Sequence, residues 1–141
     1  MSWASLLGGM ALANAGLGVI HGLAAPIGGQ FPAPHGAICA ALLPYGVAAN
    51  IRAGASLARY AEVARILTED ASATPEDGAR WLQSLIRQLG IPQLASYGIK
   101  PAHWPGLAVA ASRSNSMKAN PVVLSEQRII QVLAAEDAAT L

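Results

Sequence analysis

The first third of this chain carries no formal charge. All nine Lys and Arg residues and all eight Asp and Glu residues lie at or beyond Arg52. The whole sequence is 53% hydrophobic and only 12% charged, which excludes an intrinsically disordered chain and favours a compact, largely buried fold. An uncharged stretch of this length also raises the alternative of a membrane or secretion segment.

The N-terminal segment lacks the marks of a signal peptide and of a membrane helix. No positive charge precedes its first apolar run. Residues 3–27 are long enough to span a bilayer, but they contain Asn14, His21 and several glycines, and no Lys or Arg flanks them. We therefore expect no membrane partner and a cytoplasmic location, which also suits a chain with a single cysteine, Cys39.

Net charge and length further limit the possible binding partners and the possible folds. A net charge of +1 without any Lys or Arg cluster gives no electrostatic basis for binding nucleic acid. The 141 residues suffice for one domain, and their apolar side chains recur at helical spacing with no convincing alternating strand. The sequence therefore predicts an all-α fold, in a single helical domain over residues 1–141.

The expected helices are separated by segments rich in Gly, Pro or polar residues. Residues 26–34 contain three prolines and a glycine pair and are predicted to form a loop, as are residues 113–123. Pro44 is predicted to kink or break the third helix. Helices are expected over residues 2–12, 19–25, 35–50, 55–69, 75–89, 94–97 and 101–112, and after an N-cap at Ser125.

The clearest local signal begins the fifth of these helices. Thr74 is the expected N-cap, Pro75 takes the first helical position, and Glu76 and Asp77 follow in the first turn. The buried faces of this helix and of the last one are predicted to be Trp81, Leu82, Leu85, Ile86 and Leu89, and Ile129, Ile130, Val132 and Leu133.

Two of the three histidines, His21 and His35, bracket the predicted Gly- and Pro-rich loop. A rigid loop can hold two helix-terminal imidazoles at a fixed distance, as a metal site requires. Zinc and iron sites want three or four protein ligands, however, and no acidic residue precedes Glu62. Spacing alone therefore leaves a second interpretation open, in which His21 is a hydrogen-bonded core residue and His35 bonds its own loop.

Several stretches of the chain form a longer pattern. They are NAGLGVIHGLA (14–24), PIGGQF (26–31), PHG (34–36), LLP (42–44), LASYGI (94–99), ANP (119–121) and LSE (124–126). Together they closely resemble the signature and the C-terminal segments of the iron-containing (group III) alcohol dehydrogenases. In that family the two histidines of the long motif are metal ligands, and by position they correspond to His21 and His35.

The resemblance implies the helical, bundle-like C-terminal domain of the dehydroquinate synthase-like, iron alcohol dehydrogenase fold, with Fe²⁺ or Zn²⁺ as its metal. The family's other two ligands, an Asp and a His, lie upstream of the motif, and its NAD(P) domain carries a Gly-Gly-Gly-Ser turn; neither is found here. We expect the metal-binding portion of an iron-dependent NAD(P) alcohol dehydrogenase-like oxidoreductase, inactive alone and able to bind NAD(P) only with the missing domain.

Four other residues bear on the site. Phe31 and Cys39 are candidate pocket-lining residues, although Cys39 also fits a small buried hydrophobe on an apolar helix. His103 matches no family ligand and is interpreted as a surface or packing residue. Ala25 stands where many relatives have a further histidine near the substrate, so a proton relay at that position lacks its usual residue. No catalytic or cofactor-binding residue is assigned.

A second class of function remains open, a non-catalytic oligomerisation or scaffold module derived from the same family. The expected partners are a second copy of the chain, as a homodimer, or a separate NAD-binding chain. In either case the uncharged first third is expected to be the buried centre of a larger helical domain, with the two imidazoles inside it. The three tryptophans are expected to be core or interface anchors.

Overall fold

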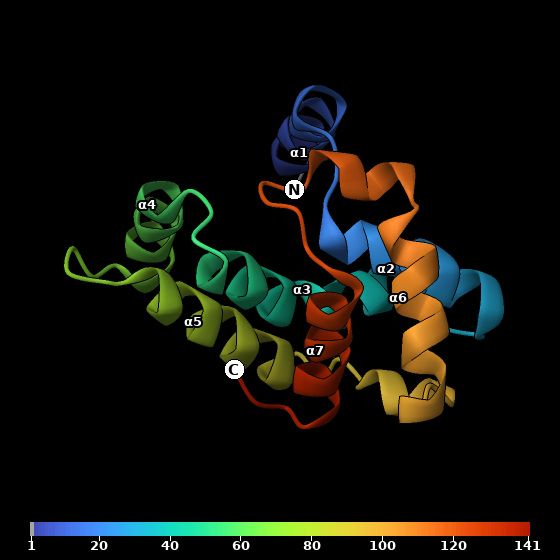
Figure 1. Cartoon of the computed structure of the whole chain (residues 1–141). Helices are drawn as coiled ribbons and strands as arrows, with labels where there is room; N and C mark the ends of the chain where they lie inside the picture. The colour runs from blue at the N-terminus through green and yellow to red at the C-terminus, as the bar shows by residue number, and fades with distance from the viewer. Residues whose placement is uncertain (1) are drawn as a thin grey trace.

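The computed structural model describes residues 2–141 (Figure 1). Over these residues it contains seven α-helices, three short 3-10 helices and no strand, so the all-α prediction is confirmed. The elements follow in the order α1 (Ser2–Ala15), α2 (Val19–Gln30), α3 (His35–Arg52), α4 (Leu57–Thr68), α5 (Pro75–Gln88), η1 (Leu94–Tyr97), η2 (Pro101–His103), α6 (Trp104–Ser112), η3 (Asn115–Ala119) and α7 (Glu126–Asp137).

The main core lies where α2, α3, α6 and α7 meet. Helix α2 packs on both α3 and α6, and α7 packs on the same two helices. The largest fully buried side chains at this junction are Leu23, Ile27, Ile38, Leu42, Leu107, Ile129 and Leu133. Burying one aliphatic side chain of this size contributes about 1.5–3 kcal/mol, so this junction fixes α2 and α3 relative to each other.

Helices α4 and α5 form a pair that packs on α3 (Figure 1), and Gln83 and Arg87 of α5 donate to the carbonyl of Ala139 after α7. Thr74 is the predicted N-cap of α5, and its hydroxyl accepts the Asp77 N–H while the Asp77 carboxylate accepts the Thr74 N–H. Gly78 of α5 lies close against α4, because a Cβ added there would lie 2.9 Å from the Ala64 Cβ. The predicted apolar stripe of α5 is only partly covered, and Leu89 is 63% exposed.

The prediction of a loop over residues 26–34 is wrong in its first half. Helix α2 continues through Pro26 to Gln30, and only residues 31–34 link it to α3. A proline inside a helix costs about 3 kcal/mol because it removes a hydrogen-bond donor and crowds the preceding turn. Here Leu23 and Ile27, on either side of Pro26, are fully buried, and that burial offsets the cost. Helix α3 likewise continues through the buried Pro44 without a break.

The other helical predictions need smaller changes. The predicted helix over residues 101–112 is a 3-10 turn, η2, followed by α6, and the predicted loop over residues 113–123 contains the 3-10 helix η3. Ser125 caps α7 as predicted, since its hydroxyl accepts the Arg128 N–H. The predicted face of α7 is buried except for Ile130, which is half-buried.

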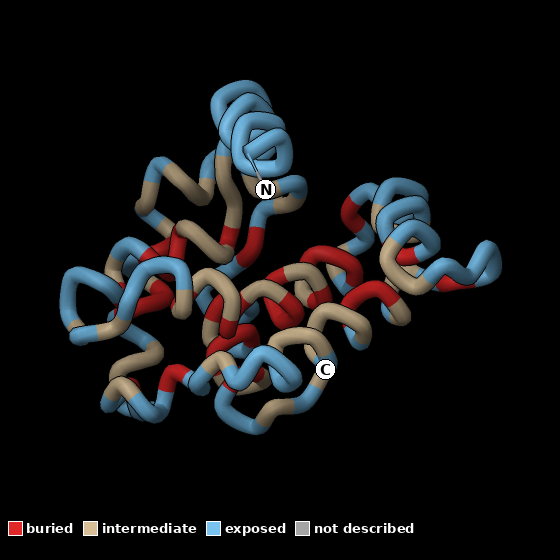
Figure 2. Tube along the Cα trace, turned by 180° about the vertical axis from the view of Figure 1, so that it is seen from behind, coloured by how far each residue is buried: buried red, intermediate tan, exposed pale blue. Residues whose placement is uncertain are grey.

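Helix α1 stands outside the core, and every residue of it is exposed (Figure 2). Much of α2 and α3, in the uncharged first third, is therefore buried within this chain, whereas α1 is not. The reason is that α1 has no partner helix over most of its surface, so its apolar side chains face solvent. Trp3 is 77% exposed, and Leu6, Leu7 and Met10 are each more than half exposed.

Between Ser2 and Leu141 no single helix is both long and apolar enough to cross a membrane. Helices α1 and α2 pass that test only when taken together, and they are bent by 99° at the break between them.

Candidate metal centre

The two histidines singled out in the sequence meet in space. His21 lies in the first turn of α2 and His35 is the first residue of α3. Their ring centroids are 5.5 Å apart, and the ring planes are tilted by 50°. Because the two side chains come from different helices, their proximity depends on how α2 packs against α3 and not on either helix alone.

Cys39 joins the pair from one helical turn further along α3. Its Sγ lies 3.5 Å from Nε2 of His35. One donor atom from each of His21, His35 and Cys39 can be chosen so that all three lie within 4.8 Å of one another. Two imidazoles and a thiol thus converge on one point, and this donor set fits a divalent transition metal ion.

The surroundings favour the uncharged forms of His21 and Cys39. Burial, and secondarily the neighbouring His35, lower the pKa of His21 below its usual value. Burial also raises the pKa of the Cys39 thiol. Burial therefore favours the neutral imidazole of His21, the form that can coordinate a metal ion. It also favours the protonated thiol of Cys39, which would lose its proton on binding a metal ion.

An asparagine pair, not singled out in the sequence as functional, anchors the helix that carries His21. Asn120 Oδ1 accepts the N–H of Val19 at 3.0 Å, two residues before His21. Asn120 Nδ2 donates to Oδ1 of the buried Asn50 on α3 at 2.8 Å, and to the carbonyl of Val122. Through these hydrogen bonds the pair connects the start of α2 to α3 and to the loop between η3 and α7. The signal that could have revealed it is that Asn50 is one of few polar residues in an uncharged stretch.

Two glycines allow the close approach that the site needs. A Cβ on Gly18 would lie 2.6 Å from Asn120 Oδ1, where the start of α2 meets the asparagine pair. A Cβ on Gly46 would lie 2.8 Å from the side chain of Ile20, so only glycine lets α3 come this near to α2. The glycines are thus part of what fixes His21 opposite His35.

Phe31 and His103 lie together at another place. Phe31 follows α2 directly, and its ring centroid is 5.0 Å from that of His103. His103 Nδ1 accepts the backbone N–H of Lys100, and its ring packs on Phe31. The structure thus gives His103 the packing role expected from the sequence, and it places Phe31 against His103.

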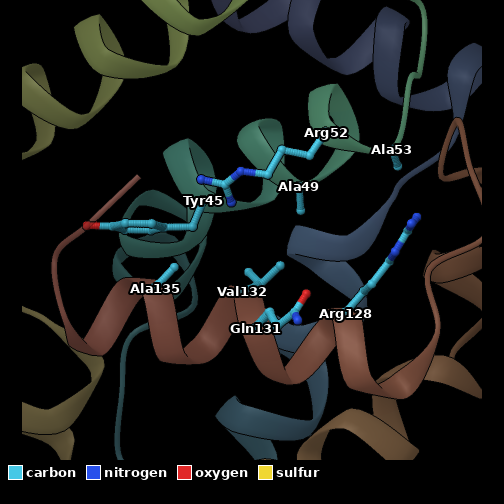
Figure 3. A pocket seen from close by; sticks show the side chains of 8 residues that line it. All are labelled: Tyr45, Ala49, Arg52, Ala53, Arg128, Gln131, Val132 and Ala135. Atoms are coloured by element: carbon cyan, nitrogen blue, oxygen red, sulfur yellow. The ribbon is translucent and has the colours of Figure 1, made fainter.

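The cavities around the domain differ in their chemistry. An open hollow of about 450 Å³ lies between α1 and the start of α2, and His21, Asn50, Tyr60 and Asn120 are among its lining residues. A smaller one, of about 190 Å³, lies between α3 and α7 (Figure 3). Two arginines, Arg52 and Arg128, line the smaller hollow along with alanines, and no His, Cys or carboxylate does. Of the three candidate donors, His21 lines the first hollow, and His35 and Cys39 line neither of the two.

Comparison with known proteins places this chain and its fold in one family. The model of the Fe-containing alcohol dehydrogenase family, C-terminal, matches residues 1–136. The chain therefore belongs to the iron-containing alcohol dehydrogenase family and corresponds to its C-terminal part, as the sequence motifs predicted. Its fold is the all-α C-terminal domain of that family.

Two relatives show what share of a family member's length this chain matches. A 1,3-propanediol dehydrogenase of Klebsiella pneumoniae is 33% identical over 138 residues, which cover 94% of this chain and 35% of that protein. Alcohol dehydrogenase 4 of Saccharomyces cerevisiae is 32% identical over 134 residues, with the same two shares. The chain thus spans about a third of the length of the curated relatives that it matches.

Solved structures show the same correspondence in three dimensions. The crystal structure of a 1,3-propanediol oxidoreductase superimposes with a TM-score of 0.86 at 31% sequence identity, over 95% of this chain and 36% of that one. An alcohol dehydrogenase from Oenococcus oeni superimposes with a TM-score of 0.80 at 32% identity, over 94% and 36% of the two chains.

Proposed function

We propose that this chain is the metal-binding portion of an iron-dependent NAD(P) alcohol dehydrogenase-like oxidoreductase. His21 and His35 are the proposed ligands of Fe²⁺, or of Zn²⁺. The observation that carries this proposal is the meeting of the two imidazoles, 5.5 Å apart, from two different helices of a family known for its iron. A cytoplasmic location is part of the same proposal.

Each residue of the site has a defined task in this proposal. His21 offers a neutral imidazole because burial disfavours its charged form. His35, at the exposed start of α3, offers the second imidazole, and the asparagine pair holds the start of α2 so that the two rings face one point. A metal ion bound there supplies Lewis-acid polarisation of an alcohol or carbonyl oxygen, and hydride transfer belongs to a nicotinamide held elsewhere.

The chain by itself should not turn over alcohol. Its match covers about a third of the length of the relatives. The Gly-Gly-Gly-Ser turn that the family resemblance associates with NAD(P) binding does not occur in this sequence. We expect no reduction of NAD or NADP when the purified 141-residue protein is mixed with 1,3-propanediol or ethanol. Alcohol-dependent reduction above the rate of a boiled control would contradict this statement.

Metal content tests the central proposal directly. The purified protein is incubated with Fe²⁺ under anaerobic conditions, desalted, and analysed for bound metal by mass spectrometry. We expect about one ion per chain, no bound ion in a His21→Ala, His35→Ala double variant, and unchanged binding in His103→Ala, which removes the third histidine. Unchanged metal content in a double variant that retains its circular dichroism spectrum would contradict the proposal.

A second candidate function rests on α1. Its apolar surface is exposed at Trp3, Leu6, Leu7 and Met10, as in a helix that lacks its partner. We infer that this surface is covered by a second copy of the chain, as a homodimer, or by a separate NAD-binding chain. If the protein is a scaffold and not a metal site, it should be dimeric by light scattering and free of metal after the same incubation. Activity restored by adding the N-terminal portion of a relative would favour the separate chain.

A further inference from the structure

The sulfur of Cys39 lies close to ring nitrogens of both histidines. It lies on α3 one turn after His35, and its side chain is partly covered by the core. A thiol one turn away from a histidine is close to it in any helix, so the pair alone says little. The informative donor is His21, which comes from α2 and still lies within 4.8 Å of both.

The distances suit tetrahedral coordination. With a metal–sulfur bond of about 2.3 Å and a metal–nitrogen bond of about 2.1 Å, the sulfur and nitrogen of a tetrahedral site are separated by about 3.6 Å. Sγ of Cys39 and Nε2 of His35 are 3.5 Å apart before any ion is present. The widest separation among the three donors, at most 4.8 Å, requires a shift of about an ångström, which a half-buried histidine can make by a small rotation.

We propose that the Cys39 thiolate is a third protein ligand, so that His21, His35 and Cys39 form a three-ligand site for a borderline-soft divalent ion, with Zn²⁺ preferred. The inference rests on the proposed function, because it needs the two histidines to bind metal. On binding, the Cys39 S–H bond breaks, the proton passes to the solvent, and a sulfur–metal bond forms without any oxidation or reduction. A fourth position stays open for water or a substrate oxygen.

The residues around the site favour a thiolate, and not a carboxylate, as the third metal ligand. The first 51 residues contain no carboxylate, so the helices that carry both histidines offer no oxygen anion to a metal ion. Thiolate ligands favour Zn²⁺ over harder ions, whereas imidazole accepts several metals. With Cys39 included, α2 and α3 supply an imidazole–imidazole–thiolate set without any residue from outside the chain.

Cobalt provides the most direct test, because Co²⁺ replaces Zn²⁺ and a cobalt–thiolate bond absorbs strongly in the near ultraviolet. Cys39 is the single cysteine of the chain, so any such band must come from it. We expect the reduced, full-length protein to bind one Co²⁺ with this band. Cys39→Ser and Cys39→Asn should lose the band and weaken Zn²⁺ binding by at least about tenfold. His103→Gln, the matched control outside the cluster, should retain both.

The same titration separates this inference from the proposed function. One Co²⁺ bound in a histidine-dependent way, without the thiolate band, would overturn the role of Cys39 and leave the histidine pair as the metal site. No bound ion in a folded protein would overturn both. Protection of the thiol offers an independent readout: Zn²⁺ should slow alkylation of Cys39 by iodoacetamide at least about tenfold, and His21→Ala should abolish the protection. Equal alkylation rates with and without Zn²⁺ would also overturn the inference.

Discussion

Helix α1 and the helix pair α2–α3 come from the same uncharged third of the sequence, yet they have opposite surroundings. The pair α2–α3 lies in the core and carries the three candidate metal donors, whereas α1 is exposed along its whole length (Figure 2). A lack of charge shows that a segment needs cover, but it does not show what provides the cover. For α2 and α3 the cover is α6 and α7, whereas the described residues provide no such cover for α1.

The largest expected effect separates the two regions by a matched pair of substitutions. Leu23→Ala, in α2, removes a fully buried side chain and should lower the free energy of unfolding by about 2–5 kcal/mol. Leu7→Ala, in α1, removes one that is 58% exposed and should change it by no more than about 0.5 kcal/mol. Urea denaturation followed by circular dichroism measures both. Equal losses would show that α1 is covered in solution.

The asparagine pair gives the next effect. Asn120→Leu leaves the N–H of Val19 and the side chain of Asn50 without their partner, which should cost about 2–3 kcal/mol of stability. Since the start of α2 loses its anchor, we also expect Zn²⁺ affinity to fall about tenfold. Asn115→Ala, on an exposed position of η3, is the control and should change neither quantity. Loss of stability with unchanged Zn²⁺ affinity would limit Asn120 to a structural role.

A buried carboxylate in the charged part of the chain should make the folding stability depend on pH. The uncharged first third contains no carboxylate and cannot contribute in this way. Burial raises the pKa of Glu136 on α7 to about 7, although its carboxylate accepts the N–H of Leu94. A raised pKa means that the folded state prefers the protonated acid. Glu136 therefore contributes stability below its unfolded value of about 4.5 that is lost as the pH rises through about 7.

The size of that loss is on the order of 2 kcal/mol for a shift of this magnitude in a largely buried group. Urea titrations at pH 4.5, 6 and 8 on Glu136→Gln and the unmodified protein measure it as a difference between the two proteins. We expect the variant to lack this part of the pH dependence. A difference that stays constant from pH 4.5 to 8 would contradict the raised pKa.

Charged substitutions on α1 should have the smallest effect on stability, but they should change the oligomeric state. Leu6→Glu with Met10→Glu places two charges on one face of α1, where both side chains are more than half exposed. At a protein concentration at which the chain is monomeric, we expect the free energy of unfolding to change by no more than about 0.5 kcal/mol. Self-association measured by light scattering should be lost, and Leu89→Glu, at an exposed position directly after α5, should leave it intact. An unchanged oligomeric state would show that α1 is not the dimer surface.

Local sequence signals were most informative where the relevant contacts lie within a few residues. Thr74 and Asp77 form their capping box within a single turn, so the start of α5 could be predicted from four adjacent residues. The loop over residues 26–34 was predicted from the same kind of signal and is wrong up to Gln30. The burial of Leu23 and Ile27 against distant helices outweighs the local effect of Pro26.

The sequence by itself determined that the chain is helical and that it belongs with the iron-containing alcohol dehydrogenases, and it singled out His21 and His35 as candidate metal ligands. Motif residues and caps are local, and a sequence displays them directly. Only the tertiary structure decided that Cys39 meets both histidines, that Asn50 and Asn120 anchor the helix of His21, and that α1 lies uncovered. These facts depend on how close α2 comes to α3, which small residues such as Gly46 permit and which long-range packing then enforces.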